Sequence, residues 1–159
     1  MIDAKRWGLP EVTYPDGATV LEEGRHHREL LVLTSGTVRV SAQGADISEI
    51  SEPGAVFGEM AFLLDGSATA TVTAVGEARF LRSDDPDLLV SEHPEVAVEI
   101  ATTLARRLDL VTRYLADLRN QYADREDHLG VVDTVLQSLV QRQGGTEEPG
   151  SEREPDAPY

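Results

Sequence analysis

The sequence predicts a mainly β fold, an antiparallel β-roll or jelly-roll, followed by a long helix and a shorter one. Two observations support this prediction. From Val12 to Leu81, short apolar runs alternate with glycine-containing turns about every ten residues, which is typical of small antiparallel β domains. From Glu95 onward turn residues become rare, and apolar residues recur every three or four positions, which is the period of an α-helix.

The chain has 159 residues, which suits one domain with an appendage. We expect the β-roll with short flanking helices over residues 1–94 and the C-terminal helices over 95–142. The long helix should run to about Arg125, and the short one from about Asp127 to Gln141. Residues 143–159 are rich in Gly, Pro and acids with almost nothing apolar, so we expect a disordered acidic tail.

Turn signals divide the β region into its expected elements. The run LLVLTSGTVRV predicts a hairpin with its turn at Ser35–Gly36, and QGAD predicts a second turn. TATVTAVG and EARFLR are expected to complete the set of strands. After Arg82, the stretch SDDPDLL offers capping residues and a proline, which is typical of a short helix with a sharp start.

The composition excludes several classes of function. Asp and Glu number 29 against 14 Lys and Arg, a net charge of −15, which argues against nonspecific affinity for nucleic acid or anionic membranes. Cysteine is absent, so disulfides, iron–sulfur ligation and thiol redox sensing are excluded. No signal-peptide core and no apolar run of about 20 residues is present, so we expect a cytoplasmic protein without membrane partners.

The most informative stretch is residues 57–72, FGEMAFLLDGSATATV, which we call the cassette. A short helix opens with Glu59, and a polar loop and a strand follow. Amides at a helix start can face an anion, and a carboxylate can bind sugar hydroxyls. The hydroxyls of Ser67, Thr69, Thr71 and Thr73 share one face if the segment is extended. The cassette therefore suits a small phosphorylated ligand, although it contains no cation.

Four segments together resemble the cyclic nucleotide-binding domain: TYPDGATVLEEG, ELLVLTSGTVRV, EPGAVFGEMAFLLDG and SATATVTA. The long helix with LARRLDLV is similar to the helix that follows the β-roll in the catabolite activator class of bacterial regulators. The resemblance covers roughly residues 12–142, and its most specific part is FGEMAFLLDG with ATATVTA behind it. It implies a nonenzymatic regulatory module of signal transduction whose ligand is a cyclic nucleotide, cAMP or cGMP.

The resemblance also implies roles for single residues. The glutamate of FGE would take the ribose 2′-hydroxyl, the next two residues would offer backbone N–H groups to the phosphate, and a threonine of the long helix would meet the base. The family's phosphate-neutralising arginine is expected at position 68, where this chain has alanine. The expected ligand-binding residues are Phe57, Gly58, Glu59, Met60, Ala61, Ala68, Thr69, Ala70, Thr71 and Thr112.

The missing arginine leaves two functions open. A hydrogen-bonded contact between arginine and phosphate contributes about 1.5–3 kcal/mol. Its loss would weaken binding about 10- to 100-fold or somewhat more. The protein is then either a regulatory sensor that binds a nucleotide weakly or binds a related ligand, or a degenerate, ligand-free scaffold that dimerises and docks a protein partner.

Apolar residues in the long helix predict a homodimer. From residue 108 their spacing alternates between three and four, which is the heptad seam of a two-helix coiled coil. Extending the register places Arg125 in the seam, where two copies would repel. The expected interface over about 108–122 consists of Leu108, Val111, Leu115, Leu118 and Tyr122.

Other activities receive little support. His26, His27 and Glu29 loosely resemble the first motif of the cupins, metal enzymes on a related β-roll, but neighbouring strand residues point to opposite faces. No further histidine follows the Pro-Gly turn, so we expect no metal site and no catalytic residue. The residues after Arg142 are few and acidic, so no helix-turn-helix and no DNA binding are expected.

Overall fold

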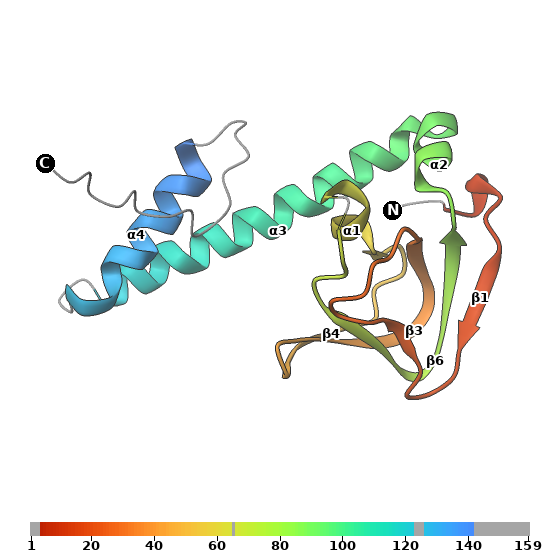
Figure 1. Ribbon diagram of the computed structural model, residues 1–159, viewed down its shortest axis with the longest axis horizontal. Coiled ribbons are helices and arrows are strands. Elements are labelled where there is room, and N and C mark those ends of the chain that lie inside the picture. Colours follow the sequence, from red (N-terminus) through yellow and green to blue (C-terminus); the bar gives the residue numbers. More distant parts are fainter. Residues whose placement is uncertain (1–3, 65, 123–125, 142–159) are drawn as a thin grey trace, which may run out of the picture. The chain divides into compact units, whose positions relative to one another are not determined.

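The computed structural model of the protein describes residues 4–64, 66–122 and 126–141 (Figure 1). Arg125 and the acidic tail lie outside these residues. The chain divides into two compact units, Met1–Leu104 and Ala105–Tyr159. Among the described residues, no helix is both long and apolar enough to cross a membrane.

The first unit contains an antiparallel six-stranded sheet, as the sequence predicts, with helices after it. Its order is β1-β6-β3-β4, while β2 pairs with β6 and β5 pairs with β3. The two long strands β3 and β6 therefore organise the roll. The strands are β1 (Glu11–Tyr14), β2 (Thr19–Leu21), β3 (Leu30–Ala42), β4 (Ala45–Ile50), β5 (Val56–Phe57) and β6 (Thr71–Ser83).

The predicted hairpin at Ser35–Gly36 is wrong, because β3 runs straight through it. Gly36 has a φ of +93°, and a Cβ built on it would lie 2.3 Å from the carbonyl oxygen of Glu77 on β6. The register of β3 against β6 shifts on both sides of Ser35. Gly36 therefore allows a β-bulge and a close approach of the two backbones, and it does not form a turn.

The final β segments also form one strand, because β6 passes through Gly76 without a break. The turn expected at QGAD is confirmed. Gln43 and Gly44 have φ values of +53° and +79° and join β3 to β4. Positive φ at both central residues is the geometry that matches the twist of a two-residue hairpin.

Two apolar clusters use opposite faces of β3. Leu31 and Leu33 belong to the cluster inside the roll, and Leu30 and Val32 to the cluster that includes residues of the helices. This alternation follows from the two-residue period of a strand. The first cluster contains Val20, Leu21, Leu31, Leu33, Val38, Phe57, Val72, Ala74, Ala78 and Phe80, and the second contains Trp7, Leu30, Val32, Val56, Leu81, Leu89, Val96 and Ile100.

The helices start where the sequence offers caps. The Asp85 side chain accepts a hydrogen bond from the Leu88 amide at 3.1 Å, directly ahead of a proline at the first helical position. The long helix α3 ends at Gln121, earlier than the predicted Arg125. The apolar period contains no stop signal of its own, so the sequence prediction placed this end too late. The helical elements are η1 (Ala4–Trp7), α1 (Glu59–Leu64), α2 (Pro86–Glu92), α3 (Pro94–Gln121) and α4 (Glu126–Gln141).

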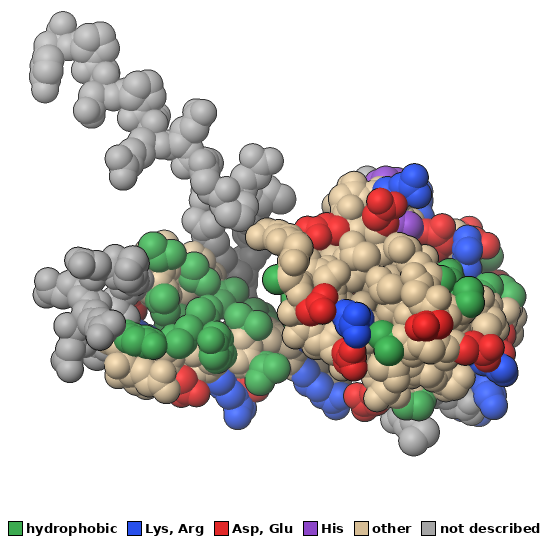
Figure 2. All heavy atoms as spheres, turned by 90° about the horizontal axis from the view of Figure 1, so that it is seen from below, with side chains coloured by type: hydrophobic (Ala, Val, Ile, Leu, Met, Phe, Trp, Pro, Cys, Tyr) green, Lys and Arg blue, Asp and Glu red, His purple; other side chains and the backbone are tan. Residues whose placement is uncertain are grey.

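The second unit contains the end of α3 together with α4. An ion pair joins the two helices, with 2.8 Å between Nε of Arg119 and Oδ1 of Asp133. Figure 2 shows hydrophobic side chains gathered on the surface of this unit. They leave an apolar surface that the described residues of the unit do not cover.

Candidate ligand-binding site

The first arm of the cassette, residues 57–61, leaves the sheet through a glycine turn. Phe57 pairs with Leu31 on β3, and Gly58 follows with a φ of +86°. A Cβ at position 58 would lie 2.3 Å from the carbonyl oxygen of Glu29, closer than side-chain atoms come. Only glycine fits this position, which places the start of α1 directly against the segment that precedes β3.

The first arm then buries a carboxylate. Glu59 opens α1 and is 4% exposed, as buried as its neighbour Ala61. Met60 between them is half-buried. A buried charged side chain is uncommon, because its desolvation must be offset by specific contacts. The predicted contact of Glu59 with a sugar hydroxyl stays a prediction, and the structure shows that its carboxylate is buried at the start of α1.

The second arm, residues 67–71, is held by the segment at 23–26. The Ala68 amide donates to the Arg25 carbonyl at 2.8 Å, and the Gly24 amide donates to the Ala68 carbonyl at 2.8 Å. His26 and Ser67 form an isolated antiparallel bridge next to this pair. Ala68 is 7% exposed, so the position expected to hold an arginine lies among buried groups.

The cassette hydroxyls and the helix threonine differ in their surroundings. Thr69 is exposed, and Ala70 beside it is half-buried. The Thr71 hydroxyl accepts a hydrogen bond from the Glu23 amide at 3.0 Å, so it supports the loop structure. Thr112 is half-buried and belongs to the second unit.

Arginines with described contacts in the first unit pair with acids. An ion pair between two exposed side chains contributes little to stability, and its partners are easily exchanged. The pairs are Arg25 with Glu22 at 3.3 Å, Arg28 with Asp87 at 2.9 Å, Arg39 with Glu49 at 2.9 Å, Arg79 with Glu77 at 2.8 Å and Arg82 with Asp84 at 2.6 Å.

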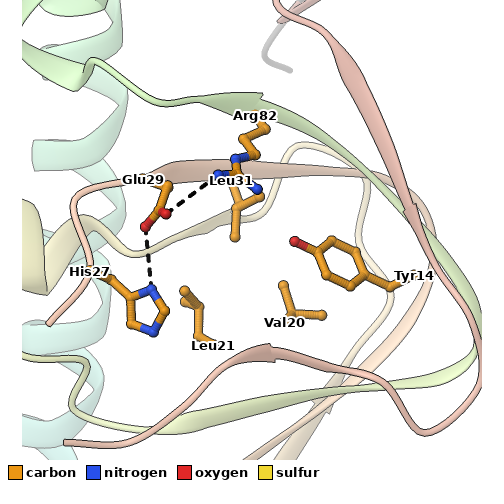
Figure 3. Close-up of a pocket in the computed structure, with 7 residues that line it drawn as sticks. All are labelled: Tyr14, Val20, Leu21, His27, Glu29, Leu31 and Arg82. Atoms are coloured by element: carbon orange, nitrogen blue, oxygen red, sulfur yellow. Dashed lines mark hydrogen bonds and ion pairs between the residues drawn. The ribbon is translucent and has the colours of Figure 1, made fainter. Parts of the chain in front are cut away.

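A pocket of about 150 Å³ opens inside the roll, close to the first arm but without any cassette residue in its wall (Figure 3). The Glu29 carboxylate lies between two partners, His27 Nδ1 at 3.2 Å and an Arg82 guanidinium nitrogen at 3.4 Å. Among the residues that the structure describes, the buried Nε2 atom of His27 finds no hydrogen-bond partner. The wall consists of Tyr14, Val20, Leu21, His27, Glu29, Leu31 and Arg82.

The charges in this pocket favour an ionised Glu29. Partial burial acts to raise the pKa of its carboxyl, but a backbone hydrogen bond, His27 and Arg82 together lower the pKa below its usual value. A hydrogen bond with Asp84 is the main cause that raises the pKa of Arg82. The Arg82 guanidinium therefore contacts two carboxylates, and the ionised Glu29 would repel a phosphate that entered the pocket.

Sequence reasoning did not bring Glu29 and Arg82 together. The period of two along β6 could have found the contact, because Phe80 points into the roll and Arg82, two residues on, shares its face. The same period separates the histidines: His26 is exposed and His27 lines the pocket. In the part of the chain that the structure describes, no group of three acids and histidines is arranged to hold a metal ion.

An antiparallel roll with a glycine turn, a short helix and a braced second arm defines a small-ligand-binding domain of the cyclic nucleotide type. Residues 11–89 match the family described as the cyclic nucleotide-binding domain. The chain belongs to this family, as its motifs indicate.

Relatives of known name support the same assignment. The chain is 32% identical over 151 residues to a CRP-like cAMP-activated global transcriptional regulator of Mycobacterium tuberculosis, covering 91% of this chain and 65% of the relative. The Thermus thermophilus catabolite activator protein structure matches with 30% identity and a TM-score of 0.62, over 72% of this chain and 56% of that one. The N-terminal domain of a Streptomyces coelicolor A3(2) transcriptional regulator matches at 31% identity, with a TM-score of 0.51, over 67% and 81%. This chain thus spans 65% of the first relative's length.

Proposed function

We propose that this protein is a nonenzymatic regulatory module that binds a cyclic nucleotide, cAMP or cGMP, in its β-roll. The observation that carries the proposal is the geometry of the cassette. Gly58 sets a turn that only glycine fits, Glu59 is buried at the start of α1, and Ala68 is fixed by two backbone hydrogen bonds. A relative described as cAMP-activated supports the choice of ligand.

The position of Ala68 sets the expected affinity. Without a guanidinium at this position, binding should be about 10- to 100-fold weaker than with one. Calorimetric titration with cAMP and with cGMP should therefore show weak but saturable binding to the wild-type protein. Ala68→Arg should tighten that binding by about the same factor, because the new side chain leaves the second arm beside the proposed phosphate position.

A matched variant distinguishes a local contact between the new guanidinium and the phosphate from a general effect of added positive charge. Ser67→Arg adds the same charge one residue earlier, at an exposed position whose side chain points to the other face of the bridge. It should change the affinity by less than about twofold, because an exposed charge is screened by salt. Equal tightening by both variants would contradict the placement of the phosphate beside position 68.

The second candidate is a scaffold that has lost its ligand. The observation that favours it is Ala68 itself, a buried apolar residue where a phosphate site needs a cation. Absence of heat with either nucleotide, in the wild type and in Ala68→Arg alike, would select the scaffold. Saturable binding by the wild type would reject it.

We also propose that the module is a homodimer through α3. Three residues of the expected seam are strongly exposed, Leu108 at 47%, Val111 at 49% and Tyr122 at 48%, which an isolated helix does not explain. Leu110 and Tyr114 are exposed as well, at 70% and 62%, and widen the apolar stripe beyond the predicted heptad positions. A partner copy that covers this stripe would bury it.

A further inference from the structure

We infer that Arg25 supplies part of the positive charge that position 68 lacks, by extending along the second arm to the phosphate of the bound nucleotide in a solvent-screened contact that is weaker than one from a buried arginine at position 68. This inference rests on the proposed function, and it assigns a residue outside the cassette to the same site. Arg25 follows β2, more than forty residues before Ala68 in the sequence, so cassette motifs alone do not include it. The fold is what brings the two positions together.

The backbone places Arg25 opposite Ala68. The Ala68 amide donates to the Arg25 carbonyl, and the Gly24 amide donates to the Ala68 carbonyl, both at 2.8 Å. The neighbouring bridge between His26 and Ser67 fixes the antiparallel register. Gly24, with a φ of +80°, and Arg25 both oppose Ala68, which is the pattern of a glycine bulge. The register of the bridge places position 25 across from position 68, and residues across from each other in an antiparallel pair project to the same side. A guanidinium at 25 can therefore reach the space that one at 68 would occupy.

The side chain of Arg25 is also available. It is 74% exposed, and its described partner is Glu22, itself 56% exposed, at 3.3 Å. Such a pair contributes little to stability, because water and salt screen it and both side chains lose rotamer freedom. A phosphate accepts guanidinium hydrogen bonds in a planar fork and is the stronger partner. Exchange of Glu22 for the ligand should therefore cost little.

Arg82 is the main competitor, and its environment argues against it. It donates to Asp84 at 2.6 Å and to Glu29 at 3.4 Å, so two carboxylates already surround it. A phosphate that entered this pocket would meet the Glu29 carboxylate beside the guanidinium (Figure 3). In the described structure, Arg25 has one acidic partner, which is exposed, whereas Arg82 has two, the half-buried Glu29 and the exposed Asp84.

The test is calorimetric titration of cAMP into the full chain and three variants. Arg25→Gln should bind about tenfold more weakly than the wild type or worse, because the phosphate loses its cation. Arg28→Gln is the matched control, an exposed arginine of the same segment that pairs with Asp87 at 2.9 Å, and it should bind within about twofold of the wild type. The double variant Arg25→Gln with Ala68→Arg should recover the lost affinity.

The salt dependence of cAMP affinity is a second measurement, and it compares slopes within each protein rather than affinities between the wild type and the variant. Raising KCl should weaken wild-type binding more steeply than binding by Arg25→Gln, since the variant lacks the screened contact. Wild-type affinity retained in Arg25→Gln, or equal salt slopes, would overturn the role of Arg25 and leave the proposed function standing. A wild type that binds neither cAMP nor cGMP would overturn both.

Discussion

The contact between Gly58 and the Glu29 carbonyl should be essential for the stability of the roll, and Gly58→Ala tests it. The new residue must keep a φ of +86°, a left-handed conformation that costs an L-residue about 1–2 kcal/mol. Its Cβ would also lie 2.3 Å from the Glu29 oxygen, so one of the two backbones must move. We expect a total loss of about 2–4 kcal/mol in the free energy of unfolding.

Gly76→Ala is the matched control. Gly76 also has a positive φ, +71°, but a Cβ there would meet nothing within 4 Å. Its substitution should cost only the backbone strain of about 1–2 kcal/mol. The excess loss in Gly58→Ala then measures the close approach of the cassette to Glu29.

Urea unfolding followed by tryptophan fluorescence is the assay. Trp7 is the single tryptophan, and it is buried in one cluster with Leu30 and Val56, which flank the contact on both sides. Its emission therefore reports on the first unit. Equal losses of stability in Gly58→Ala and Gly76→Ala would refute the reasoning, and so would an unchanged midpoint for Gly58→Ala.

Two further predictions concern the other unit and the pocket. Leu115→Glu with Leu118→Glu should convert the proposed dimer into monomers in sedimentation experiments, because the proposed seam would then contain four acids. Asn120→Glu, at an exposed position, should not, and a wild type that is monomeric at tens of micromolar would refute the interface. Because the pKa of Glu29 is lowered by folding, its ionised form stabilises the first unit above the usual carboxyl pKa of about 4.3, and this stabilisation is lost as the pH falls through the lower folded value. Glu29→Gln should therefore flatten the fall in unfolding free energy as the pH drops below the usual carboxyl pKa, and an unchanged pH profile would contradict it.

The sequence contains enough to predict the class of fold, because that depends on repeated local signals. Turn residues about every ten positions predict the antiparallel strands, and the FGE motif predicts the start of α1. The strand–glycine–helix order at residues 57–59 involves only adjacent residues, so reading along the chain finds it. Ala68 is likewise visible in the sequence as a missing cation.

The errors within the β-roll occurred where glycine has more than one structural role. Ser35–Gly36 has the composition of a hairpin turn, yet the chain continues as β3 because Gly36 lies against the Glu77 carbonyl of β6. That role depends on a strand about forty residues away, and no local pattern reveals it. The pairing of Arg25 with Ala68 was missed for the same reason, since an isolated bridge lacks the regular alternation of a strand.

The segment at residues 23–29 connects the cassette to the interior of the roll. Its amides and carbonyls hold the second arm at Thr71 and Ala68, and its last carbonyl lies against Gly58 in the first arm. The side chain of Glu29 extends from the same segment to Arg82 on β6, two residues beyond the central Phe80. A ligand that moves either arm must therefore also move this segment, unless its hydrogen bonds break. Because those bonds and the Arg82 contact belong to one short stretch of chain, ligand affinity and the stability of the roll should be coupled through it.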